Sequence, residues 1–150
     1  KEMNKTILFL MLFSTSVFAN GPIRPILSMT PGDVDPKATI EKICTPGYTK
    51  TVRNVSAKTK KEVFANYGIN PHQDRYEIDH LISLELGGSN DVKNLWPESY
   101  TTTPFNAYKK DALENKLHDM VCADKLPLHE AQRVIVEDWV KAYHDYVLQH

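Results

Sequence analysis

The sequence has almost no excess charge, only two cysteines, and no long apolar run beyond its first nineteen residues. Its 150 residues include 18 Lys and Arg against 19 Asp and Glu, a formal net charge of −1. This balance excludes the strongly basic class of nucleic-acid-binding proteins, so any nucleic-acid site must be a local patch. With 41% apolar and 25% charged residues, the composition also excludes a disordered tail, a collagen-like chain and a multi-span membrane protein.

The first nineteen residues have the pattern of a secretory signal peptide. Lys1 and Lys5 flank the start, an apolar run covers residues 7–13, and Val17 and Ala19 are the small residues of a cleavage site. An uncleaved anchor is the alternative, although the apolar run is short for a membrane span. We therefore expect residues 1–19 to be a signal peptide, a secreted or periplasmic location, and no stable membrane insertion after cleavage.

The rest of the chain contains no internal repeat or low-complexity segment, and its length suits one domain. Residues 20–36 carry four prolines and two glycines, which exclude a long helix there. We expect an extended leader over residues 20–36 and a domain over residues 37–150.

The two cysteines contain no CxxC pattern, and two thiols alone make a poor zinc site. In an oxidising compartment an isolated pair usually forms a disulfide, which predicts a bond between Cys44 and Cys122. Two buried free thiols are the alternative.

Apolar spacing and capping residues predict an α+β protein that is mainly helical. Helices are expected over residues 58–67, 104–121 and 128–147, the second capped by Thr103. Shorter apolar stretches predict strands over residues 48–52, 76–86 and 92–96, and the glycine pair at 87–88 predicts a turn between the last two.

The segment from Tyr76 to Pro97 carries the most chemistry. It contains Asp79 followed directly by His80, then the Gly-Gly turn, then Asn94 on the return strand. A carboxylate binds hard divalent cations through oxygen, and an imidazole titrates near neutrality and can accept a proton from water. Because neighbours on a strand point to opposite faces, Asp79 and His80 can share one site only where the strand ends or bends.

This combination resembles the HNH endonuclease family, whose motif is a two-stranded hairpin and a helix around one metal ion. The matching stretch covers about residues 76–117, under a third of the chain. More loosely, the chain is similar to small secreted bacterial HNH-signature proteins, through segments 44–49, 84–89 and 110–118. The resemblance implies a short ββα-metal motif within the α+β fold.

The resemblance also implies roles for individual residues. Asp79 matches the metal-binding acid, His80 the general base, and Asn94 the asparagine that orients the hairpin. The third motif position, a metal ligand on the helix, has two candidates, Asn106 and His118. Asn106 lies seven residues before Leu113, within about 20° of the same helix face, whereas His118 points about 120° away, which favours Asn106 and leaves His118 open.

The implied activity is metal-dependent hydrolysis of phosphodiester bonds in DNA, or in RNA, with little sequence specificity. Lys109, Lys110 and Arg75 are candidates for neutralising the phosphate. Two protein ligands with several waters suit Mg²⁺ or Mn²⁺, whereas a nitrogen ligand such as His118 would favour Zn²⁺ or Ni²⁺. A module on the same fold that binds metal or nucleic acid without hydrolysis, and a purely structural disulfide-closed protein, are the alternatives. No residue pattern indicates a protein partner.

Overall fold

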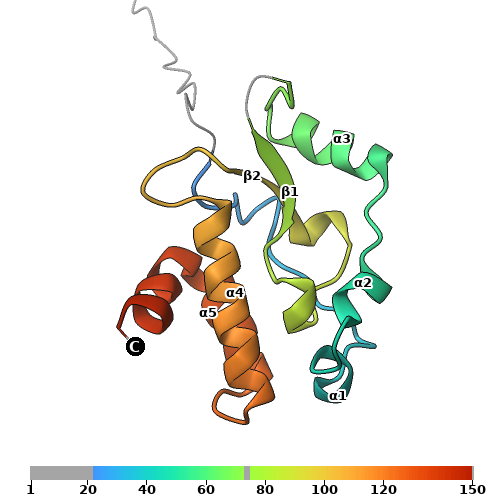
Figure 1. The fold of residues 1–150 in the computed structure, drawn as a ribbon. Coiled ribbons are helices and arrows are strands. Elements are labelled where there is room, and N and C mark those ends of the chain that lie inside the picture. The colour runs from blue at the N-terminus through green and yellow to red at the C-terminus, as the bar shows by residue number, and fades with distance from the viewer. Residues whose placement is uncertain (1–21, 73–74, 150) are drawn as a thin grey trace, which may run out of the picture.

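The computed structural model describes residues 22–72 and 75–149, which form an α+β fold around a two-stranded antiparallel sheet (Figure 1). The helices are α1 (Ile40–Ile43), α2 (Tyr48–Val52), α3 (Ala57–Asn66), α4 (Ala107–Cys122) and α5 (Leu128–Tyr143), and the strands are β1 (Tyr76–His80) and β2 (Leu95–Ser99). Short turns of 3₁₀ helix, η1 (Leu84–Leu86) and η2 (Val92–Asn94), lie between the strands, and a π-helical turn, η3 (His144–Leu148), follows α5. None of the described helices is both long and apolar enough to cross a membrane.

The hairpin of β1 and β2 is confirmed, but its strands have different ends from those expected. β1 stops at His80, and β2 continues through Pro97, which pairs with Ile78, to Ser99. Proline lacks an N–H, and a sheet of two strands has outer edges where that N–H is not needed. Helix α3 lies beside β2, and α4 reaches the end of β1, so the hairpin lies between them (Figure 1).

Residues 48–52 form helix α2, and the predicted strand there is wrong. The segment holds the β-branched residues Thr49, Thr51 and Val52, which favour strands. Gly47 has φ 84°, a left-handed conformation that glycine adopts easily, and it turns the chain directly into the helix. The sheet of the described residues contains only β1 and β2, so this segment has no strand to pair with.

The main apolar core lies between α4 and α5, which run side by side (Figure 1). Leu113 and Leu117 of α4 and Ile135 of α5 are fully buried, and Trp139 is 1% exposed. Burying each such side chain contributes about 1.5–3 kcal/mol. The last helix, expected from apolar spacing, therefore contributes buried residues to the core.

Helix α4 begins at Ala107, three residues later than expected at Pro104. Asn106 is its N-cap, because its side-chain oxygen accepts a hydrogen bond from the Lys109 N–H at 3.3 Å. The proposed Thr103 cap lies outside the helix. Asn106 thus has a local structural role.

The expected signal peptide, residues 1–19, lies outside the described residues, whereas most of the expected leader is described and packs on the hairpin. Thr30 is fully buried and donates to the Leu95 carbonyl oxygen at 3.0 Å. The Gly32 N–H donates to Lys93 O at 3.0 Å, and Val34 forms a β-bridge with Gly88. Residues 30–34 therefore pack against β2 and against the loop between the strands.

The Cys44–Cys122 disulfide is present, as predicted. Cys44 follows α1 directly, and Cys122 is the last residue of α4. The bond therefore joins the first helix to the central one across 78 residues of sequence. Such a bond is compatible with a secreted protein in an oxidising compartment.

Replacing both cysteines, Cys44→Ser with Cys122→Ser, is expected to lower the free energy of unfolding by up to about 4 kcal/mol, because the unfolded chain loses a long closed loop. Denaturant unfolding measures the loss. A reducing agent should lower the stability of the wild-type protein similarly and leave the double variant unchanged. A wild-type protein indifferent to reduction would contradict this prediction.

Candidate functional site

Asn94 fixes the loop that joins the strands. Its Nδ2 donates to the carbonyl oxygens of Ile82 and Ser89, each at 2.9 Å, and its Oδ1 accepts from the Ile82 N–H at 2.9 Å. Gly88 lies against this amide, and a Cβ there would come within 1.8 Å of the Ile82 oxygen. Asn94 therefore makes the contacts that a loop-orienting residue requires, and the loop backbone approaches too closely for any residue but glycine at position 88.

His80 is the last residue of β1 and is 3% exposed. Its Nε2 lies 3.1 Å from Oδ1 of Asn90, which belongs to the same loop. Asn90 is itself fixed, because its Nδ2 donates to the Val52 carbonyl oxygen at 2.8 Å and its Oδ1 accepts from the Asn54 N–H at 3.2 Å. The end of helix α2 thus holds the asparagine that holds the imidazole.

These contacts assign the protons of the His80 ring. The Asn90 amide donates to a carbonyl oxygen, so its Oδ1 faces the imidazole and must accept from Nε2–H. In the neutral ring the lone pair is then on Nδ1, and no hydrogen bond among the described residues engages that atom. Burial lowers the pKa of His80, and the nearby charges of Arg53 and Lys110 also lower it, against Asn90 and Asp79, which raise it. A neutral imidazole with a free Nδ1 is suited to accept a proton.

Lys110 of α4 lies beside Asp79 at the end of β1 and is completely buried. Its Nζ donates to Asp79 Oδ2 at 2.6 Å, to the His80 carbonyl oxygen at 2.8 Å, and to the carboxylate of Glu114 one turn along α4. Burial alone would lower the pKa of Lys110, but the Asp79 and Glu114 carboxylates raise it above its usual value. The ammonium therefore stays charged and ties α4 to the hairpin.

Three carboxylates lie together on the hairpin face that carries Asp79. Glu77 is two residues from Asp79 on β1, and Glu98 on β2 pairs with Glu77. One oxygen from each of Glu77, Asp79 and Glu98 lies within 4.8 Å of the others. Glu98 is 2% exposed, and burial beside Asp79 raises its pKa well above the usual value. The group offers oxygen ligands of the kind that hard cations prefer.

The two helix residues expected to complete a metal site make other contacts in the structure. The Asn106 side chain is engaged by the helix cap and by the Thr102 carbonyl oxygen, to which its Nδ2 donates at 3.1 Å. His118 lies beside the disulfide, with Nε2 3.0 Å from the Ile43 carbonyl oxygen. Eight residues of helix separate it from Lys110, about 12 Å along the axis. The α4 residue that contacts Asp79 is Lys110.

The three candidate phosphate ligands also occupy different surroundings. Lys110 donates to three acceptors in a fully buried setting, which leaves no ammonium surface for a phosphate and corrects the role expected for it. Lys109 lies over the ring of Tyr143, 5.6 Å from its centroid and on the α5 side of the helix. Arg75 is exposed directly before β1.

Arg53 is the cation near His80 that the sequence analysis did not single out. It follows α2 directly and is exposed. Burial lowers the pKa of His80 and the charge of Arg53 adds to this, whereas at Asp111 burial raises the pKa and Arg53 opposes the rise. No short-range pattern connects it with His80, because the link runs through the contact of Asn90 with α2. Glu98 and Asn90 were missed for the same reason.

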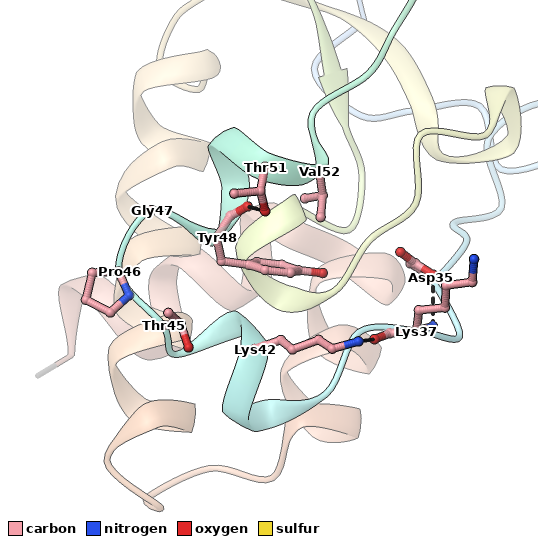
Figure 2. Close-up of a pocket in the computed structure, with 9 residues that line it drawn as sticks. All are labelled: Asp35, Lys37, Lys42, Thr45, Pro46, Gly47, Tyr48, Thr51 and Val52. Atoms are coloured by element: carbon pink, nitrogen blue, oxygen red, sulfur yellow. Dashed lines mark hydrogen bonds between the residues drawn. The ribbon is translucent and has the colours of Figure 1, made fainter.

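A pocket of about 420 Å³ lies along α1 and α2 and contains none of the predicted site residues (Figure 2). The Tyr48 ring lies across it, and Lys42 Nζ donates to the Lys37 carbonyl oxygen at 2.8 Å at its edge. Burial raises the pKa of Tyr48, as does the charge of Asp35. Val52 lines the pocket while its carbonyl oxygen binds Asn90, so the pocket adjoins the support of His80.

The chain matches no protein-family model, and comparisons with curated proteins and with solved structures find no match.

Replacing the buried ammonium, Lys110→Met, is expected to lower the free energy of unfolding by about 3–5 kcal/mol, because Asp79 and Glu114 lose their shared partner. Adding Glu114→Gln should restore part of the loss, since it removes one uncompensated charge. Denaturant unfolding of both single variants and the double variant measures this coupling. Lys116→Met, which removes a lysine of α4 outside the ion-pair group, is the control and should change stability little. Equal losses in Lys110→Met and Lys116→Met would contradict this account.

Proposed function

We propose that the protein is a metal-dependent phosphodiesterase acting on nucleic acid, a nuclease of the HNH type. The observation that carries the proposal is the His80 imidazole, held through Nε2 by Asn90 at the end of a hairpin whose loop is pinned by Asn94. A base with a fixed tautomer beside a carboxylate-bearing strand is suited to hydrolysis of a phosphodiester.

In this proposal His80 is the general base. Its Nδ1 takes a proton from the water whose oxygen forms the new bond to phosphorus as the bond to the 3′ oxygen breaks. Asn90 keeps the second ring proton on Nε2 and so fixes which nitrogen accepts. Asn94 acts at a distance, by holding the loop that presents Asn90.

A divalent cation is part of the proposed activity, with Mg²⁺ or Mn²⁺ favoured. When bound, such an ion stabilises the negative charge that develops on the phosphate. The side chain of Asp79 and its carboxylate neighbours fit a hard ion, because they supply only oxygen. His118 lies beside the disulfide, which removes the argument for Zn²⁺ or Ni²⁺.

A local basic patch supports a nucleic-acid substrate despite the net charge of −1. Residues 50–61 contain no Asp or Glu and carry exposed cations on α2, α3 and the link between them: Lys50, Arg53, Lys58, Lys60 and Lys61. This stretch adjoins His80 through the contact of Val52 with Asn90. Lysine and arginine side chains bind the phosphate backbone, and phosphate contacts do not distinguish base sequences. We therefore propose cleavage of DNA, or of RNA, with little sequence preference.

The protein is proposed to act outside the cytoplasm. The Cys44–Cys122 disulfide suits an oxidising compartment, and the N-terminal sequence pattern suits export.

A binding module without hydrolysis is the second candidate, and Lys110 favours it. Its ammonium lies 2.6 Å from Asp79 Oδ2 and competes there with any metal ion. Such a module would bind nucleic acid and leave the phosphodiester intact.

Plasmid nicking by the purified protein in Mg²⁺ or Mn²⁺ tests the activity. His80→Ala should lower the rate by at least about 100-fold, the usual contribution of a general base. His129→Ala, an exposed histidine at the start of α5, is the matched control and should cut like the wild type. A chelator should abolish cutting. Equal rates for His80→Ala and wild type would end the proposal, and tight DNA binding without cutting would favour the binding module.

The basic patch predicts a salt-dependent affinity that includes Arg53. Arg53→Gln should weaken DNA binding and reduce the slope of log affinity against log salt by about 1, because one phosphate contact is lost. Arg133→Gln removes an exposed arginine of α5 paired with Glu130 and Glu137, and should leave the slope unchanged. Fluorescence anisotropy on a short duplex over a salt series measures both, and identical slopes for the two variants would exclude Arg53 from the interface.

A further inference from the structure

We propose that Glu77, Asp79 and Glu98 together bind one divalent cation of the hard, oxygen-preferring class, Mg²⁺ or Mn²⁺. The inference deepens the proposed function, since it names the ligands of the ion that this function requires. Its experiment uses no nucleic acid and can therefore succeed or fail independently of the nuclease activity.

The hairpin register places the three carboxylates together. Residues two apart on a strand share a face, which puts Glu77 beside Asp79, and Glu98 lies directly opposite Glu77 on β2. One oxygen of each lies within 4.8 Å of the others. Oxygens bound to one ion at about 2.0–2.6 Å lie no more than about 5 Å apart, so the observed spacing fits a common ion.

Glu98 provides the second, independent observation. Its side chain is 2% exposed, and both carboxylate oxygens are closed off from solvent without a hydrogen-bond donor from the described residues. A buried carboxylate without a hydrogen-bond donor is costly, and such groups are normally paired or coordinate a metal. Glu98 points at two other carboxylates, so a cation between them would satisfy all three.

The Lys110 ammonium, the buried cation of this site, does not pair with Glu98. The Lys110 ammonium has three protons, and it gives them to Asp79 Oδ2, to the His80 carbonyl oxygen and to Glu114. It engages one oxygen of Asp79, and none of these three hydrogen bonds goes to Glu98. Four carboxyl groups thus share one ammonium, and a divalent ion would bring the group close to neutrality.

Tyr100 holds the Glu77 carboxylate in position to bind an ion. Its hydroxyl donates to Glu77 Oε2 at 2.5 Å, which fixes the carboxylate and leaves Oε1 for an ion. The other group of metal-ligand types in the described residues, Cys44, His118 and Cys122, has its two sulfurs joined in the disulfide. The carboxylate group is therefore the site that the donor chemistry favours.

Titration of the full chain with Mn²⁺, followed by the electron paramagnetic resonance signal of free Mn²⁺, tests the proposal. The wild type should bind one Mn²⁺ per chain and unfold at a higher temperature in its presence. Glu98→Gln should bind Mn²⁺ at least tenfold more weakly. Without the ion it should unfold at the wild-type temperature or above, because a neutral amide of similar size replaces a buried carboxyl group that has no hydrogen-bond donor, and this result separates lost binding from misfolding.

Glu85→Gln is the matched control, since Glu85 is a partly buried carboxylate on η1 outside the group, and it should bind Mn²⁺ like the wild type. Failure of the wild type to bind Mn²⁺, or equal affinity in Glu98→Gln, would overturn the inference and assign a proton to Glu98 instead. Loss of Mn²⁺ binding in Glu98→Gln would support the inference even if the protein does not cut DNA. The absence of cutting would reject only the proposed nuclease activity.

Discussion

The Lys110 ammonium joins the two halves of the candidate site. It extends from α4 to the last two residues of β1 and binds the Asp79 carboxylate and the His80 backbone in a fully buried setting. A buried ammonium is tolerated only when acceptors surround it, so the positions of α4 and β1 are mutually fixed. Since Asn90 holds the ring of His80, the residue is restrained through both backbone and side chain.

Much of the fold could be predicted because it follows from periodicity and capping. The apolar faces of the two long helices, the helix expected over residues 58–67, and the hairpin around a Gly-Gly turn all depend on neighbours within a few residues. Residues 48–52 could not be predicted correctly, because β-branched side chains favour a strand locally and only the absence of a pairing strand makes them helical. The start of α4 depended on which of two residues, Thr103 or Asn106, provides the cap.

The site could be predicted only along β1 and its loop. Asn94 has the loop contacts that its position in the sequence suggested. Nothing in the sequence ranks Lys110 among the three candidate phosphate ligands. Lysines are usually solvated, and Lys110 is buried because carboxylates reach it from β1 and from one turn along α4. Glu98 and Asn90 become meaningful only through strand register and the approach of α2, which no short motif records.

The segment ahead of α1 sets the limits of the autonomous folding unit. Composition separates residues 20–36 from the domain, yet Thr30 is buried against β2, and the Asp33 N–H donates to the same Asn94 oxygen that holds the loop. Asp33 also accepts from the Ser89 hydroxyl at 2.5 Å. A recombinant fragment cut at residue 37 would leave these groups without partners, so a transplantable version of the hairpin must carry its upstream residues.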